Sequence, residues 1–353
     1  MEKKRLQFLD MVKGIAIILV IIGHIEYVPA PVRIWISCFH MPVFFVVSGI
    51  LIAVKNETEY DTKTIVGKKW RGIMIPYMWF SLSFFLIDIG NVCLNKIDIH
   101  TFIVNTISAV TFYGKSVLWF LPAIFLAQLY FILIRKNLKK YIWLIAVVML
   151  TAIAYFCKLG LDSLYASYSD SLLITSVINF VRTFVRAAIA TPFVAFGYLI
   201  YVGLSKIDSG KIGIRIVCVF AGMAVLIGVY PLAMYNGCVD LHNIILANVA
   251  VYYISAFAAS LAMIVMCIGL PVIRPITYFG RNSLIVMADH LDYYILWAGI
   301  VLSMKILSIV GISNQWLFLL LIVLIVLLLS IIVIEGINRF FPFVLGKKTK
   351  EKK

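Results

Sequence analysis

The sequence is short of charged residues, and of acidic ones in particular. Only 13% of its 353 residues are charged, while 63% are hydrophobic. A soluble globular protein is nearer one quarter charged and one half apolar, so the composition excludes that class. Lysine and arginine outnumber aspartate and glutamate by 31 to 16, which gives a net charge of +15. In a chain this apolar, the excess is typical of the cytoplasmic loops of a membrane protein rather than of a nucleic-acid-binding protein.

Several other patterns are missing. The six cysteines are scattered without a CxxC pair, so we interpret them as small apolar fillers rather than metal ligands or a disulfide framework. We find no heptads, no low-complexity tract, no convincing internal repeat and no serine in a GxSxG setting. The first apolar run is too long for a cleavable signal peptide and lacks a small-residue cleavage site, so we expect a retained first span.

Apolar runs recur along the whole chain. A helical membrane span needs ~20 residues, and about ten segments meet that length. The sequence therefore predicts an all-α, polytopic integral membrane protein with one membrane domain over residues 1–340 and a basic cytoplasmic tail over 341–353. The predicted spans are roughly 11–28, 33–54, 72–94, 116–135, 141–158, 186–204, 212–232, 247–270, 281–305 and 315–336.

Basic residues set the predicted orientation. Most of the 31 lysines and arginines fall in segments that lie inside if the N-terminus is cytoplasmic, which predicts that both termini are cytoplasmic. The spans at 186–204 and 281–305 fit the pattern least well, because Arg182, Arg186 and Asp289 lie in or beside them. The longest outer connection, 159–184, is compatible with either a covering loop or an acceptor-binding one.

The first span carries ionisable groups that are costly in lipid, namely Asp10, Lys13 and His24. Eleven steps of about 100° bring Lys13 and His24 to one helix face, about 16 Å apart along the axis. Asp10 precedes Lys13 by three residues, on the same face and within pairing reach. Lys13 can extend to the inner headgroups, whereas an imidazole inside a bundle indicates a pathway or a reaction site. A neutral imidazole can take a proton from a hydroxyl and return it.

Polar residues also mark the ends of the next two spans. The stretch "FHMPVFFVVSG" (39–49) places His40 at about the depth of His24, where two histidines can line one cavity. Ser48, nearer the inner side, is either a packing residue or a ligand. In "KKWRGIMIPY" (68–77), Lys68, Lys69 and Arg71 are either topology signals or phosphate ligands, a role for which arginine is geometrically suited.

Two later stretches complete the set. In "LWFLPAIF" (118–125), Trp119 lies at an outer interface, where an aromatic belt is expected. The stretch "YFGRNSLIVMADH" (278–290) places Arg281 at the inner start of the ninth span, with Asp289 and His290 two turns deeper. An Asp–His pair inside lipid favours a functional role.

These motifs, in this order, resemble the membrane acyltransferase-3 family, which is known for ten-helix cores. The stretch "LDMVKGIAIILVIIGH" has the family's form of a basic residue, ten residues and a histidine, with Lys13 where many members carry arginine. "FHMPVFFVVSG" is similar to the second-helix motif of the fucose 4-O-acetylase-like branch. "WRGIMIPY", "LWFLPAIF" and "FGRNSL…DH" sit where the family has its third-, fourth- and ninth-helix motifs.

The resemblance implies transfer of an acyl group, usually acetyl, from cytoplasmic acetyl-CoA to a hydroxyl of a cell-surface or lipid-linked saccharide, without a metal. It also implies a location in the bacterial cytoplasmic membrane. Carried over to this sequence, His24 would be the base or acyl relay, Lys13 and Asp10 would hold the first helix and its cavity, and Arg71 would contact a CoA phosphate.

Further site residues are expected around these groups. We expect Lys68, Lys69, Ser48 and Arg281 at the acyl-CoA site, and His40, Trp119, Asp289 and His290 at the acceptor site. Only a short, mostly basic segment follows Gly336, so any second transfer step outside the cell would need a separate extracytoplasmic partner. The alternative function is a transporter or flippase with a buried proton relay, although we see no broken helices in matching halves.

Overall fold

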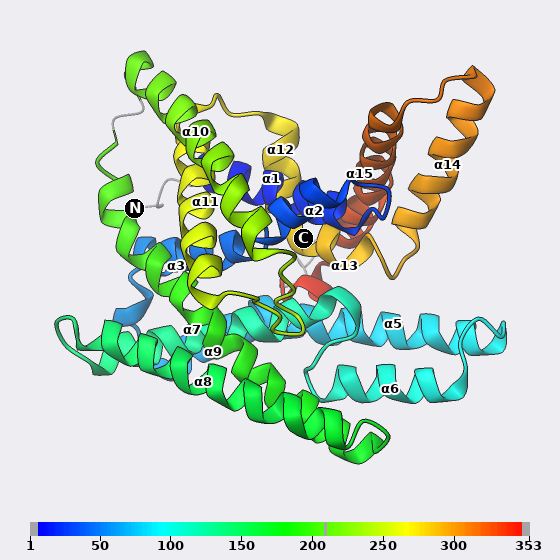
Figure 1. The fold of residues 1–353 in the computed structure, drawn as a ribbon, viewed down its shortest axis with the longest axis horizontal. Helices are drawn as coiled ribbons and strands as arrows, with labels where there is room; N and C mark the ends of the chain where they lie inside the picture. Colours follow the sequence, from blue (N-terminus) through cyan, green and yellow to red (C-terminus); the bar gives the residue numbers. More distant parts are fainter. Residues whose placement is uncertain (1–5, 208–209, 348–353) are drawn as a thin grey trace, which may run out of the picture. The chain divides into compact units, whose positions relative to one another are not determined.

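The computed structural model describes residues 6–207 and 210–347, which form helices joined by short connections (Figure 1). Within these residues no extended strand forms, and an isolated bridge pairs Asp240 with Ile245. The predicted all-α, polytopic class is confirmed. The basic cluster Lys3, Lys4 and Arg5 and the tail residues 348–353 lie outside the described residues.

In the described part of the chain, nine helical stretches are long and apolar enough to cross a membrane. They match nine of the ten predicted spans. The stretches are α1 (Gln7–His24), α2 with α3 (Ala30–Ser37 and Pro42–Val54), α4 with the π-helical turn η2 and α5 (Thr62–Lys69, Trp70–Met74 and Ile75–Cys93), η3 with α7 (Ser116–Trp119 and Phe120–Asn137), α8 (Ile142–Ser167), α9 (Leu172–Leu204), α10 (Ile212–Asn236), α11 (Val249–Gly269) and α15 (Gln315–Phe340).

The predicted ninth span, 281–305, was wrong as a single helix. It is divided among the end of α12 (Arg274–Arg281), α13 (Ser283–Asp289) and most of α14 (Ile295–Val310). Tyr294 has a φ of 59°, and a residue in the left-handed conformation cannot continue a right-handed helix. The polar residues Asp289, His290 and Asp292 fall at this break, where helical hydrogen bonding is interrupted.

Two expectations about the outer connections also change. The segment 159–184 is mostly helical, because α8 continues to Ser167 and α9 begins at Leu172. The segment between α5 and α7 contains an unpredicted helix, α6 (Ile99–Val110). The remaining short elements are the turns η1 (Glu57–Glu59) and η4 (Pro342–Leu345).

The chain divides into two compact units. One comprises Met1–Leu51 with Phe196–Ile334, and the other comprises Ile52–Ala195 with Glu335–Lys353. The helices α3, α9 and α15 each begin in one unit and end in the other. The single membrane domain expected over 1–340 stays a prediction.

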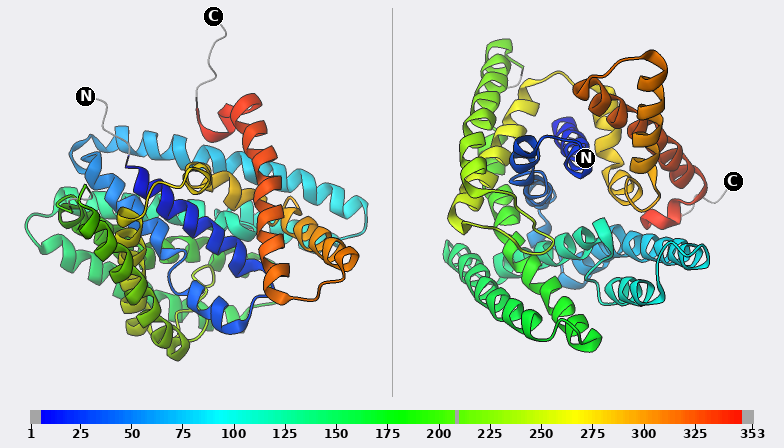
Figure 2. Two further views of the ribbon diagram at one scale, coloured as in Figure 1. Left: turned by 90° about the horizontal axis from the view of Figure 1, so that it is seen from above. Right: turned by 45° about the vertical axis from the view of Figure 1, so that its right-hand side comes forward.

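In the first unit, α1 packs against α2, α11, α12 and α13 (Figures 1 and 2). The contact with α12 brings the two backbones together. A Cβ atom on Gly280 would lie 1.7 Å from the carbonyl oxygen of Asp10, and one on Gly14 would lie 2.0 Å from that of Ile276. Small residues allow this approach in membrane helices, so glycine is required at both positions.

In the second unit, a buried carboxylate joins α5 to α6 and to the segment that follows it. Asp88 is 3% exposed. One of its oxygens pairs with Lys115 Nζ at 2.8 Å and the other accepts from Asn105 Nδ2 at 2.9 Å. The Tyr77 hydroxyl donates to the carbonyl oxygen of Ala109 at 2.6 Å. Because a buried charge is tolerated only when it is paired and hydrogen-bonded, these contacts fix α6 against α5.

We predict that Gly280→Ala destabilises the protein, by about 1–3 kcal/mol, because the added methyl group overpacks the α1–α12 contact. Gly228→Ala in α10 is the matched control, since a Cβ there meets nothing within 4 Å. The measurement is the apparent melting temperature in detergent. Equal melting temperatures for the two variants would show that the backbones do not approach so closely.

Candidate functional site

Two imidazole rings lie together in the first unit, one at the end of α1 and the other just after α13. The ring centroids of His24 and His290 are 5.2 Å apart, with their planes inclined by 41°. His290 is fully buried. Protein atoms surround much of the His24 side chain as well, but part of that residue is exposed. The pair therefore extends from the surface of this unit into its interior.

Backbone carbonyls fix the tautomers of the two other histidines in this region. His290 Nδ1 lies 2.9 Å from the oxygen of Val286, and His40 Nδ1 lies 2.8 Å from that of Ile36. A carbonyl only accepts, so both Nδ1 atoms donate, and each neutral ring keeps Nε2 as an acceptor. Among the described residues, the buried Nε2 of His290 has no hydrogen-bond partner.

His24 differs from these two rings, because no hydrogen bond to the described residues fixes either of its nitrogens. His40 is half-buried and lies close enough to interact electrostatically with His24 and with Asp240. The Asp240 carboxylate accepts hydrogen bonds from the His242 amide at 2.8 Å and from Asn243 Nδ2 at 2.7 Å. Of the three rings, His24 is thus the one that is exposed and has both nitrogens without a hydrogen bond to the described residues.

Asp289 and Ser48, both expected at ligand sites, make contacts within the protein. The Ser330 hydroxyl of α15 donates to Asp289 Oδ1 at 3.1 Å, and Asp289 is fully buried. This bond ties the end of α13 to α15. The Ser48 hydroxyl donates to the carbonyl oxygen of Phe45 within α3, at 2.7 Å. In the described residues, no group of three or more His, Cys, Asp or Glu is placed to hold a metal ion.

Three charged residues meet where α1 packs on α12. The predicted pairing of Asp10 with Lys13 is present, at 3.0 Å. Arg281 Nε approaches the second oxygen of Asp10 at 3.3 Å, a partner that sequence spacing did not indicate. The Lys13 and Arg281 side chains are 22% and 44% exposed. Two cations share one carboxylate, so this end of α1 has a net positive charge.

Basic residues in the second unit line an open pocket of about 400 Å³ beside the π-helical turn. Arg71, Lys63 and Lys68 lie on its wall, and π-helical turns occur frequently at functional sites. Lys68 also lies 4.3 Å from the centre of the Tyr60 ring. Lys69, expected here too, pairs with Glu57 at 2.5 Å, which partly neutralises its charge.

Trp119 does not lie in an exposed aromatic belt. Its side chain is 8% exposed, and the fully buried Arg186 packs against it. The guanidinium carbon lies 5.0 Å from the Trp119 ring centre and 4.8 Å from that of Tyr113, and Nη1 donates to the Tyr113 carbonyl at 3.3 Å. A desolvated cation gains from such ring contacts. The sequence drew attention to Arg186 because it places a charge in an apolar run, but it did not indicate the aromatic partners of this residue.

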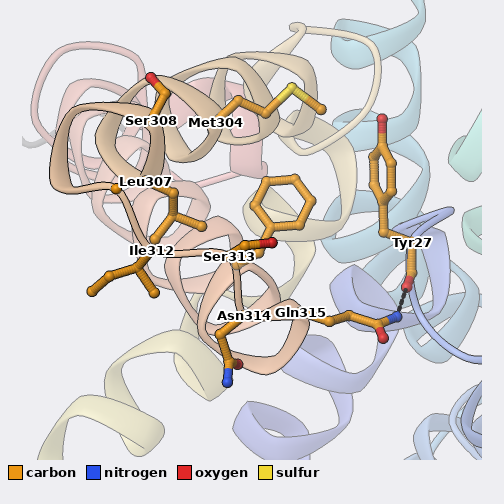
Figure 3. A pocket seen from close by; sticks show the side chains of 10 residues that line it. Tyr27, Met304, Leu307, Ser308, Ile312, Ser313, Asn314 and Gln315 are labelled. Carbon is orange, nitrogen blue, oxygen red and sulfur yellow. Dashed lines mark hydrogen bonds between the residues drawn. The ribbon is translucent and has the colours of Figure 1, made fainter.

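An open surface pocket of about 620 Å³ lies at the connection between α14 and α15 in the first unit (Figure 3). Tyr27 and Phe318 lie edge to face at 5.2 Å on its wall, and Gln315 Nε2 donates to the Tyr27 carbonyl at 3.0 Å. Tyr27 follows His24 by three residues. This open pocket therefore lies beside the segment that leaves the His24 end of α1.

The helices and the polar groups within them define a multi-pass membrane protein with ionisable residues inside its helical bundle. The sequence model of the acyltransferase domain, acyltransferase family 3, matches residues 6–335. The chain belongs to this family, as its motifs predicted, and it is therefore a membrane acyltransferase. Membership favours the enzyme over the transporter or flippase. A comparison with curated proteins gives no match.

We predict that Arg186→Lys lowers the stability of the protein by about 2 kcal/mol, because a lysine cannot keep the planar contact with two rings in a desolvated site. Arg339→Lys is the matched control, since Arg339 also lies over a ring, that of Phe340 at 5.5 Å, but is exposed. Thermal unfolding followed by tryptophan fluorescence measures both. An unaffected Arg186→Lys protein would contradict the proposed contribution of the ring contacts.

Proposed function

We propose that the protein is an O-acyltransferase that transfers an acetyl group from acetyl-CoA to a hydroxyl of a cell-surface or lipid-linked saccharide across a bacterial cytoplasmic membrane. The observation that carries the proposal is the pair of rings His24 and His290. The first ring has an exposed surface and no hydrogen bond from the described residues, while the second is buried beneath it at 5.2 Å. Such a ring can meet a reactant without first breaking a contact of its own.

The basic groups fit a donor that approaches from the cytoplasm. Acyl-CoA is large and anionic, so its phosphates stay out of lipid while its narrow pantetheine arm can enter. The predicted topology puts both the Arg71 pocket and the Asp10–Lys13–Arg281 group on the cytoplasmic side. Arginine suits phosphate because its planar fork can donate two parallel hydrogen bonds. We assign phosphate binding to Arg71 and Lys68, and positioning of α1 to Asp10.

His24 can act by either of two routes. As a base, it takes the proton of the acceptor hydroxyl while the oxygen attacks the thioester carbonyl, and it then returns that proton to the departing CoA thiolate. As a relay, its unprotonated nitrogen attacks the thioester, and the departing CoA thiolate takes the proton from the other ring nitrogen. The acceptor hydroxyl then displaces the acyl group and returns its proton to the ring. In both routes His290, whose tautomer is fixed by the Val286 carbonyl, packs against the His24 ring from the buried side, so His290 is a positioning residue.

We predict that His24→Ala lowers kcat for acetyl transfer by about 10²–10⁴-fold, the contribution of a placed acid–base group. Stability should be almost unchanged, because the exposed ring makes no hydrogen bond to the described residues. The assay measures CoA release from acetyl-CoA by the purified protein in liposomes with a saccharide acceptor. Wild-type CoA release by a properly inserted His24→Ala protein would refute the role of His24.

We predict that Arg71→Ala raises KM for acetyl-CoA by about tenfold, the loss expected when a charge-assisted hydrogen bond to phosphate is removed. The kcat should change little, because the phosphates lie far from the reacting thioester. Lys139→Ala is the control, since it removes one exposed cation from a segment predicted on the same side. Equal KM changes in the two variants would indicate a general effect of charge rather than a phosphate site.

A further inference from the structure

A more enclosed cavity, of about 240 Å³, lies between α6 and the adjoining ends of α8 and α9, all within the second unit. Its walls include Ser108, Thr111, Thr175, Ser176 and Asn179. The connection between α8 and α9 falls within the segment 159–184, for which the sequence left a covering loop and an acceptor-binding loop both open. The predicted topology places this end of the helices outside the cell.

Three of the hydroxyl groups that line this cavity can act as hydrogen-bond acceptors. The hydroxyls of Thr111, Thr175 and Ser176 donate to the carbonyl oxygens of Ile107, Ser171 and Leu172, at 2.7, 2.9 and 2.5 Å. Each hydroxyl has one hydrogen and two lone pairs. With the hydrogen used within the helix, the oxygen is left to accept a hydrogen bond from a ligand.

Asn179 adds a polar atom that the described protein leaves unsatisfied. Its Oδ1 is buried and has no hydrogen-bond partner among the described residues, and the side chain lies on the cavity wall. A buried polar atom without a partner costs free energy, so a ligand that donates a hydrogen bond to it would remove that cost.

Charge separates the ligand classes that this cavity can take. Among the described residues that line it there is neither lysine nor arginine; His100 contributes an imidazole and Asp170 a carboxylate. An anion such as phosphate would meet the like charge of Asp170 and the lone pairs of the three hydroxyls, without a fixed cation to balance it. A neutral polyol offers several hydroxyl donors, and the wall supplies acceptors for them.

The ring of Tyr165 supplies an apolar surface on the cavity wall, and contacts with neighbouring residues fix its position. The Arg182 guanidinium lies 4.7 Å from the Tyr165 ring centre, and Arg182 Nη2 pairs with Asp162 at 2.9 Å. Lys158 pairs with the other oxygen of Asp162 at 2.7 Å. A fixed aromatic ring beside several polar groups is the arrangement that binds the C–H face and the hydroxyls of one sugar ring. The volume is below the ~300–1,000 Å³ of pockets for drug-sized ligands, which limits the ligand to about one such ring.

We propose that this cavity between α6, α8 and α9 is a subsite that binds one neutral monosaccharide unit of the acceptor on the outer face of the membrane. The subsite deepens the proposed function and rests on it, since the acceptor is taken to be a saccharide. Binding at the subsite requires no chemistry at His24, so it can be tested separately from acetyl transfer.

The test is saturation-transfer NMR on the full chain in lipid nanodiscs, with the methyl glycosides of glucose, galactose, N-acetylglucosamine and fucose as probes. We expect at least one probe to bind the wild-type protein and to bind His24→Ala equally well. Asn179→Leu should weaken that binding by at least about tenfold, because the sugar hydroxyl loses its partner against an apolar side chain.

Thr175→Val has a matched control in Thr106→Val, the same isosteric change at a half-buried threonine whose hydroxyl also donates to a carbonyl four residues earlier but which does not line the cavity. Thr175→Val should weaken the binding of the sugar by about three- to tenfold, and Thr106→Val should leave the affinity unchanged. Absence of binding for all four probes, or equal affinity in Asn179→Leu and the wild type, would overturn the subsite. Acetyl transfer retained by His24→Ala would overturn the proposed function instead and leave the binding result standing.

Discussion

The close contact of α1 with α12 and α13 determines where the reactive groups of the first unit lie. Near the start of α1, Gly280 packs against the Asp10 carbonyl and Arg281 pairs with the Asp10 side chain. Near its end, His24 lies against His290. Gly14, further along α1, packs against Ile276, so α12 crosses α1 with the chain running in the opposite sense, and α13 then leads to His290 at the other end of α1. Because glycine lets the backbones meet without side chains between them, a shift of α1 would displace the charge cluster and the ring pair together.

The sequence predicted the features that depend on neighbours along the chain. Nine of the ten spans correspond to long apolar helices, because length and hydropathy are local properties. The Asp10–Lys13 pair followed from a spacing of three residues. Partners far apart in sequence could not be predicted this way. His290 beside His24, Arg281 beside Asp10 and Arg186 beside Trp119 each required the fold.

The break within the predicted ninth span has the same origin. It contains long apolar stretches, yet the polar residues Asp289, His290 and Asp292 interrupt it, and Tyr294 takes a left-handed conformation. Polar side chains within a span are compatible with a helix or with a break, depending on what packs around them. Here the Ser330 hydroxyl bonds Asp289. This hydrogen bond holds the end of α13 against α15, and the spacing of residues along the sequence does not predict it.

The described structure separates ionisable groups with structural partners from the one that is available to a reactant. Asp88 is enclosed by Lys115 and Asn105, and Arg186 by two aromatic rings, so these charges stabilise the fold. His290 and His40 each donate a hydrogen bond to a backbone carbonyl, which fixes their tautomers. A ring in this state can receive a proton at Nε2, but its Nδ1 is occupied. His24 makes no such hydrogen bond to the described residues, so its tautomer is not fixed in this way, and its side chain is exposed. Of the three imidazoles, it is therefore the one whose nitrogens can both exchange a proton with a substrate.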